Sequence, residues 1–280
     1  MDSEVQEPFK PINIREMFME KNPKLAKKLP GFVYNYINHI LHVEEINEIL
    51  EKYGHERGVD FARSIVKHFN VSQTINGLEN LPKDGRFIFA SNHPLGGFDA
   101  LLILSKIDEF FGTPITLVND ILMSIPQLRP IFIPLNKYGG HNKDVINQLH
   151  GAYSSDNPIL IFPCGYASRR KKGVIADPEW KKHFIAKAIE YKRDVIPIHA
   201  SGRNSDFFYN LANFRTSFHI KWNLETFFLP DELFKQKNQS FTITFGKPIP
   251  YQSFDKSKTL DQWAAEVRDI VYKLPNEYQH

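Results

Sequence analysis

Short apolar runs alternate with longer segments of helical character along most of this chain, from Val71 onward. Such alternation predicts an α/β fold with a mostly parallel sheet flanked by helices. The runs that predict strands are 86–91, 115–118, 131–135, 159–162, 194–199, 224–229 and 241–245. The segments that predict helices are 100–109, 143–153, 180–191, 207–214 and 260–273.

The first seventy residues carry spaced apolar positions instead, which predict helices over 14–29, 33–51 and 61–69. At 280 residues the chain is long enough for one large domain with a helical extension. We therefore expect an N-terminal helical region over 1–70 and the main domain over 71–280.

The net charge of +3 is too small to indicate binding to nucleic acid. The charge is unevenly placed, however, because residues 160–222 hold 12 Lys and Arg against 5 Asp and Glu. This excess suits anionic lipid headgroups or an acidic acyl carrier, and it also fits an ordinary solvated basic surface.

Cellular location is limited by three features of the sequence. The single cysteine excludes an internal disulfide and fits a reducing compartment. The first residues are acidic, unlike those of a signal peptide, and the longest obvious apolar run, 100–104, is too short to span a bilayer. We expect a cytoplasmic protein that meets membrane only from the surface.

The segment from Phe87 to Asp99, FIFASNHPLGGFD, takes an apolar strand into a Gly-Gly turn. His93 precedes a proline, which favours extended geometry, so we expect it at the exit of the strand. Asp99 can reach His93 only if the chain turns between them, and Gly96-Gly97 permits that turn. A neutral imidazole held by a carboxylate is a competent general base near neutral pH. The spacing alone also fits a surface histidine and an aspartate that caps the next helix.

Three further blocks follow in order: RPIFIPLN at 129–136, IFPCGYASR at 161–169 and VIPIH at 195–199. Together with Asn92, His93 and Asp99, they resemble the four motifs of the glycerophospholipid (lysophosphatidate-type) acyltransferases. The resemblance spans 86–205 and is nearest to a bacterial branch with a His-Pro-Leu-Gly-Gly-x-Asp motif, which includes enzymes that O-acylate lyso-aminolipids.

The chain departs from the main family at three places. One residue is added between His93 and Asp99, within the glycine-rich turn, where the pairing can survive it. Asn136-Lys137 stands where the family has Arg, and Cys164 stands where it has Glu. The last two changes disfavour a glycerol phosphate acceptor and favour a lyso-aminolipid with a free carboxylate.

The resemblance implies acyl transfer from a thioester, carried by acyl carrier protein or CoA, to a lysolipid hydroxyl. His93 would take the hydroxyl proton, and Asp99 would orient the resulting imidazolium. Because the donor is already activated, neither a cofactor nor a metal is expected. Backbone N–H groups near Gly96-Gly97 or Gly165 are candidates for stabilising the oxyanion.

The resemblance also assigns substrate binding to the motif residues. Arg169 is the first choice for an acidic group, because a guanidinium contacts a carboxylate or phosphate at two points. Lys137 could replace the missing Arg as a point charge, and Pro197 belongs to the block that shapes the acceptor pocket. The full set is Asn92, Gly96, Gly97, Asn136, Lys137, Phe162, Pro163, Gly165, Ser168, Arg169 and Pro197.

Aromatic and aliphatic residues between Phe18 and Ile40 stand beside Lys21, Lys24, Lys27 and Lys28. This composition is typical of a helix at a membrane interface, and it fits equally a helical pair packed on the catalytic core. The resemblance favours peripheral attachment to the inner face of the cell membrane.

Two other functions fit parts of the sequence. Cys164 could serve as the nucleophile of a hydrolase or thioesterase, with His93 or His199 as its base. A non-catalytic lipid-binding module is the other alternative, although retention of His93 and Asp99 disfavours it. We expect the apolar runs at 207–208 and 227–229 to be core, not the lining of an acyl tunnel.

Overall fold

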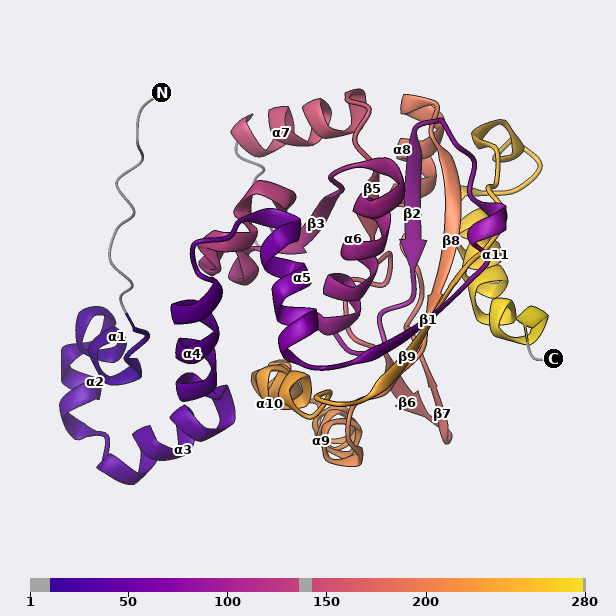
Figure 1. Cartoon of the computed structure of the whole chain (residues 1–280). Coiled ribbons are helices and arrows are strands. Elements are labelled where there is room, and N and C mark those ends of the chain that lie inside the picture. The colour runs from indigo at the N-terminus through magenta and orange to yellow at the C-terminus, as the bar shows by residue number, and fades with distance from the viewer. Residues whose placement is uncertain (1–10, 136–142, 279–280) are drawn as a thin grey trace, which may run out of the picture.

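A seven-stranded sheet forms the centre of the computed structural model, which describes residues 11–135 and 143–278 (Figure 1). Its strand order is β1–β9–β8–β2–β5–β3–β4. The five strands from β8 to β4 are parallel, whereas β9 runs antiparallel to β8 and parallel to β1. The sheet is mostly parallel, as predicted. The strands are β1 Ser72–Asn76, β2 Phe87–Ser91, β3 Ile115–Asn119, β4 Phe132–Leu135, β5 Ile159–Ile161, β8 Asp194–Ala200 and β9 Ser240–Phe245.

Helices cover both faces of this sheet (Figure 1). Alternate residues of the buried strand β2 point to opposite faces, so Phe89 packs with α5 and α6 while Ile88 packs with α8 and α11. The helices are α1 Ile14–Lys21, α2 Pro23–Lys28, α3 Gly31–Leu41, α4 Val43–Tyr53, α5 Gly58–His68, α6 Phe98–Phe111, α7 Lys143–Ser154, α8 His183–Tyr191, α9 Asp206–Ser217, α10 Leu229–Phe234 and α11 Leu260–Lys273.

Two predicted N-terminal helices are each broken in two. Asn22 ends α1 and caps α2, whose first residue is Pro23, and His42 separates α3 from α4 with a left-handed backbone (φ 50°). Helices α1, α3 and α4 contribute Ile14, Tyr34 and Val43, respectively, to a small core separate from the main one. In contrast, α5 packs into the main core beside α6.

The strand predicted at 224–229 is wrong. This segment forms a 3₁₀ helix, η4 (Leu224–Phe228), followed directly by α10. The apolar Phe227 of this segment is exposed, whereas its buried residue is the charged Glu225, which is held by two arginines. The prediction that 207–208 and 227–229 are core is therefore wrong for Phe207 and Phe227, which are 50% and 64% exposed. A short antiparallel hairpin of β6 (Arg169–Lys171) and β7 (Val174–Ala176) was not predicted, and neither was β1.

The parallel strands β2, β5 and β8 all end at the same edge of the sheet. The segments that follow them begin at Asn92, Phe162 and Ser201, so three of the four sequence blocks meet at this edge. Ligands of open α/β sheets gather at such an edge. No helix among the described residues has the length and apolar character needed to cross a membrane.

Candidate active site

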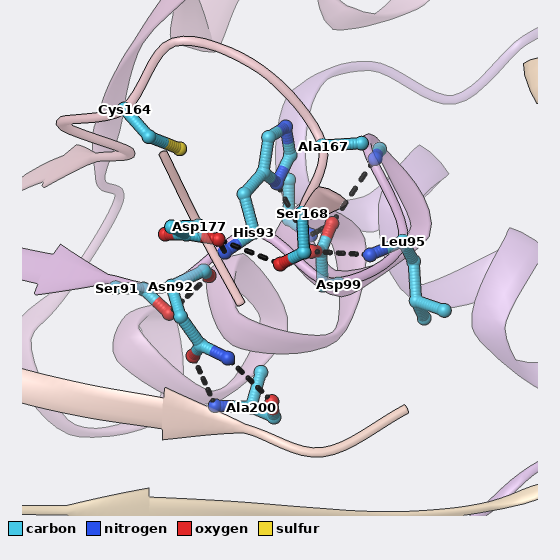
Figure 2. Close-up of polar contacts among 12 residues, drawn as sticks. Ser91, Asn92, His93, Leu95, Asp99, Cys164, Ala167, Ser168, Asp177 and Ala200 are labelled. Carbon is cyan, nitrogen blue, oxygen red and sulfur yellow. Dashed lines mark hydrogen bonds and ion pairs between the residues drawn. The ribbon is translucent and has the colours of Figure 1, made fainter. Parts of the chain in front are cut away.

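Asn92, which follows β2, forms two hydrogen bonds with the backbone at the end of β8. Its Nδ2 donates to the carbonyl oxygen of Ala200 at 2.9 Å, and its Oδ1 accepts the Ala200 N–H at 2.7 Å (Figure 2). The carboxamide is buried and uses both of its ends in this contact. Asn92 therefore fixes the backbone from which His93 extends, and its predicted contact with substrate stays a prediction.

His93 and Asp99 are paired, as the glycine-rich turn predicted. The Nδ1 of His93 lies 3.0 Å from Oδ2 of Asp99 (Figure 2). The Asp99 carboxylate is fully buried and also accepts the N–H groups of Leu95, Gly97 and Ala100 at 3.0–3.1 Å. With four donors around it, the carboxylate is satisfied as an anion and holds the proton of His93 on Nδ1. Nε2 then carries the lone pair.

Several groups act on the pKa of His93. Burial alone would lower it, but the charge and hydrogen bond of Asp99, together with the charge of Asp177, raise the pKa above its ordinary value. No described residue forms a hydrogen bond with Nε2 of His93, whose side chain is 14% exposed. This nitrogen is thus available to a substrate hydroxyl.

The loop after β5 covers the imidazole. Phe162 stacks on the His93 ring with 4.0 Å between the ring centroids and 27° between their planes. Gly165 has a positive φ of 68° and donates its N–H to the carbonyl oxygen of Phe162, which closes a tight turn. The N–H of Lys181 binds the carbonyl of Pro163. The predicted third block therefore lies against His93.

Asp177 links His93 to this loop, and no motif in the sequence indicated it. Its Oδ1 accepts the backbone N–H of His93 at 3.1 Å and the hydroxyl of Ser168 at 2.6 Å (Figure 2). Its Oδ2 accepts the indole N–H of Trp180 at 2.9 Å. The N–H of Ser168 also donates to the carbonyl oxygen of His93. Ser168 is thus engaged in holding His93, and its contact with substrate stays a prediction.

Arg169 belongs to a buried ion network. Its guanidinium contacts Glu225 of η4 at 2.9 Å and donates to the carbonyl oxygen of Ala167 at 2.6 Å, while Glu225 also pairs with Arg215 of α9 at 2.9 Å. Burial lowers the pKa of Arg169, which Glu225 opposes. Two guanidinium groups on one carboxylate leave one net positive charge beside the site.

The remaining predicted residues have distinct surroundings. A Cβ on Gly96 (φ 76°) would lie 2.9 Å from the side chains of Ala167 and Leu229, so only glycine fits the close approach of the turn to the third block. Gly97 donates its N–H to Asp99. Pro197 is a buried residue of β8 beside Gly246. Asn136 and Lys137 lie outside the described residues.

The geometry of Cys164 opposes a role as nucleophile. The thiol is 1% exposed and donates to the carbonyl oxygen of Tyr166. Burial, with the charge of Asp177 adding to it, raises the pKa of the thiol far above its ordinary value. A catalytic cysteine needs the opposite shift. Burial also lowers the pKa of His199 to about 4, so this histidine stays neutral.

A buried carboxylate thus orients a histidine at the carboxyl edge of an α/β sheet, which is the geometry that a general base requires. The sequence matches the family described as "Acyltransferase" over residues 16–279, and the chain belongs to this family. It is an acyltransferase.

Two curated relatives are similar over nearly their whole length. The lyso-glycine lipid O-acyltransferase of Bacteroides thetaiotaomicron is 46% identical over 264 residues, which cover 94% of this chain and 97% of the relative. The lyso-glycine lipid O-acyltransferase of Phocaeicola vulgatus is 46% identical over 266 residues, with 94% and 95% covered. A solved 1-acyl-sn-glycerophosphate (LPA) acyltransferase, PlsC, from Thermotoga maritima has 15% identity and a TM-score of 0.46, over 88% of this chain and 94% of that one.

Proposed function

We propose that this protein transfers a fatty acyl group from an acyl thioester to the hydroxyl of a lysolipid, with a lyso-aminolipid as its preferred acceptor. The observation that carries the proposal is the pairing of His93 Nδ1 with the buried Asp99, which presents Nε2 as a base. The relatives named for lyso-glycine lipid support the choice of acceptor. The donor is an acyl carrier protein or CoA thioester, and the enzyme works at the inner face of the cell membrane.

The reaction follows from this base. Nε2 of His93 takes the hydroxyl proton as the acceptor oxygen attacks the thioester carbonyl carbon. Asp99 stabilises the imidazolium. The tetrahedral oxyanion then collapses, its C–S bond breaks, and the leaving thiolate takes the proton from the imidazolium. Of the predicted oxyanion donors, Gly97 and Gly165 already donate their N–H groups to Asp99 and Phe162, whereas the Gly96 N–H donates to no other described residue.

An anionic acceptor headgroup fits the charge of the Arg169–Glu225–Arg215 network, which carries one net positive charge. A lyso-glycine lipid ends in a carboxylate and bears its hydroxyl on the acyl chain. Arg169 is our proposed partner for that carboxylate, because the guanidinium offers more donors than Glu225 and Ala167 use.

The test compares initial rates with an N-(3-hydroxyacyl)glycine and with lysophosphatidate, using one acyl thioester. We expect faster transfer to the glycine lipid and a selective loss of this rate in Arg169→Lys, since an ammonium cannot make the planar two-point contact. His93→Ala serves as the control for the chemical step and should lower either rate by roughly 10²- to 10⁴-fold. A strong preference for lysophosphatidate would overturn the acceptor, and full turnover by His93→Ala would overturn the mechanism.

A further inference from the structure

Six large aromatic side chains project into solvent from three neighbouring parts of the fold. They are 53–77% exposed, with Trp222 the most exposed of all. Isolated exposed aromatics are ordinary on soluble proteins, but clusters of them mark interaction surfaces. We call this set the aromatic rim: Phe32 and Tyr36 of α3, Phe214 of α9, and Phe218, Trp222 and Phe227, which follow α9 or lie in η4.

The elements that carry the rim contact one another. Helix α3 contacts both α10 and η4, and α9 contacts η4 and strand β6. The rings of Phe214 and Phe218 are 4.5 Å apart. Figure 1 shows α3, α10, α9 and the β6–β7 hairpin near the edge of the sheet toward which the arrow of β2 points. That is the edge at which His93 lies.

Packing within the chain does not account for these residues. Phe208, Tyr209 and Ala212 of α9 are buried and supply its inner face. Phe214 lies outside this buried set, and Phe227 is exposed in a segment where Glu225 and α10 supply the buried contacts. The aromatic rim thus adds nothing to the packing of the core, so the exposure of these apolar side chains requires another explanation.

The charges near the rim are positive. Lys171 and Lys172 at the tip of the hairpin and Lys221 beside Trp222 are exposed, and none forms an ion pair with another described residue. The acidic residues nearby are already matched by cations, since Asp206 pairs with Arg170 and Glu225 pairs with two arginines. These unpaired positive charges therefore favour a negatively charged partner over a neutral or positively charged one.

We propose that the aromatic rim and these three lysines form a surface that rests on an anionic lipid bilayer. Phe, Tyr and Trp rings favour the boundary between headgroups and acyl chains, and each exposed lysine adds attraction to anionic headgroups. The proposal rests on the proposed function, because a lysolipid acceptor is itself held in a bilayer. Docking by this edge brings that acceptor to the side of the sheet where His93 acts.

The test measures binding of the full chain to vesicles of phosphatidylcholine with and without phosphatidylglycerol. The double substitution Phe218→Ser and Trp222→Ser should weaken binding by about tenfold or more, since burial of one large apolar side chain is worth at least that factor. Phe110→Ser is the matched control, because Phe110 is 45% exposed near the end of α6, away from the edge where α6 begins. Unchanged binding by the double variant, or equal loss by the control, would overturn the proposal.

A second measurement locates the membrane directly. Brominated acyl chains should quench tryptophan fluorescence in the wild type, and Trp222→Phe should remove most of this quenching while binding is kept. Of the two other tryptophans, Trp180 is buried and Trp263 is half-buried against Phe254. Equal quenching in both proteins would overturn the placement of Trp222 in lipid. If the double variant instead changes a dimer into a monomer in sedimentation, a second copy covers the rim and the proposal fails. Vesicle binding needs no substrate, so failure of acyl transfer would count against the proposed function alone.

Discussion

The Asp99 carboxylate does two things at the scale of the single residue. It accepts the N–H groups of Gly97 and Ala100 at the start of α6, and it holds Nδ1 of His93. The sequence left open whether Asp99 caps the helix or pairs with His93, and in the structure it makes both contacts. Because both contacts use the same buried group, the backbone of the turn fixes the orientation of the imidazole.

The raised pKa of His93 predicts the pH dependence of the reaction. Nε2 acts as a base only when the ring is neutral, so kcat/KM should fall as the pH drops through a pKa above the ordinary 6.5. Asp99→Asn removes the main favourable charge and should move this acidic limb to lower pH while lowering kcat. The measurement is a pH–rate profile of both proteins, and an acidic limb of the wild type at or below pH 6.5 would contradict the assignment.

The same shift has a consequence for stability. A raised folded-state pKa means that protonated His93 stabilises the native protein. This contribution should be complete below the unfolded-state pKa, near 6.5, and should disappear as the pH rises through the folded-state value. The measurement is the difference in unfolding free energy between the wild type and His93→Gln as a function of pH. This difference should shrink as the pH rises above the folded-state pKa of His93.

We expect Asp177 to act as a positioning residue, because its carboxylate accepts the backbone N–H of His93 and is otherwise bonded to Ser168 and Trp180. Asp177→Asn should lower kcat by about tenfold or more and also lower the apparent pKa of the base, since the charge of Asp177 helps to raise it. Ser168→Ala is the matched control, since it removes one hydrogen bond to the same carboxylate but no charge. A loss of stability in Asp177→Asn with an unchanged pH profile would mean that Asp177 is structural only.

Cys164 allows a simple test of the hydrolase alternative. Cys164→Ala should keep at least roughly half of the wild-type kcat, because the thiol is buried and its raised pKa keeps it protonated. Alkylating reagents should also modify the folded protein slowly. Loss of all acyl transfer in a folded Cys164→Ala protein would restore the cysteine as a catalytic candidate.

At the scale of secondary-structure elements, Arg193 links the end of α7 and the loop that follows it to the start of strands β2 and β8. Its fully buried guanidinium donates to five carbonyl oxygens, those of Phe87, Ala152, Tyr153, Ser155 and Asn157. Burial and the charge of Arg86 lower its pKa to about 10.

Replacing this arginine should destabilise the protein without touching the chemistry. Arg193→Leu leaves buried carbonyl groups unpaired and should cost about 3 kcal/mol or more of unfolding free energy. Arg193→Lys, with three donors for five acceptors, should fall between that variant and the wild type. Chemical denaturation measures the order, and kcat of the folded fraction should stay near wild type because Arg193 lies at the opposite edge from His93. Equal stability of all three proteins would contradict this.

The elements also show what the sequence could predict. Apolar runs identified six strands of the main sheet, because both faces of these strands are covered and their side chains are apolar almost throughout. The polar edge strand β1, SQTIN, has no such run. The β6–β7 hairpin has no apolar run either, because β6 reads RRK; its tight turn has a positive φ at both Lys172 and Gly173.

At the site, the sequence could predict contacts between residues close together in the chain, and it could not predict contacts between distant ones. The pairing of His93 with Asp99 depends on a turn within seven residues, and the glycines there signal that turn. Asp177 lies 84 positions after His93, and Glu225 lies 56 positions after Arg169. Only the packing of the third block against the end of β2 brings Asp177 to His93, and no spacing in the sequence encodes that contact.

At the scale of the whole molecule, the structure bears on both interpretations of the N-terminal extension that the sequence left open. Lys24, Lys27 and Lys28 of α2 are exposed, and none forms an ion pair with another described residue. Helix α3 contacts α10 and η4, so the extension also packs on the main domain. The structure thus supports core packing for α3 while leaving the lysines of α2 free to meet a lipid surface.

Neutralising the lysines of α2 tests whether their charges contribute to membrane binding. The triple substitution Lys24→Gln, Lys27→Gln and Lys28→Gln should weaken binding to anionic vesicles by roughly a hundredfold at low salt, at about 1 kcal/mol for each cation near the surface. The difference from wild type should shrink as salt screens the charges. Lys83→Gln with Lys192→Gln is the control, because both exposed lysines lie near the amino ends of β2 and β8. Wild-type binding by the triple variant at low salt would show that the lysines of α2 have no role in membrane attachment.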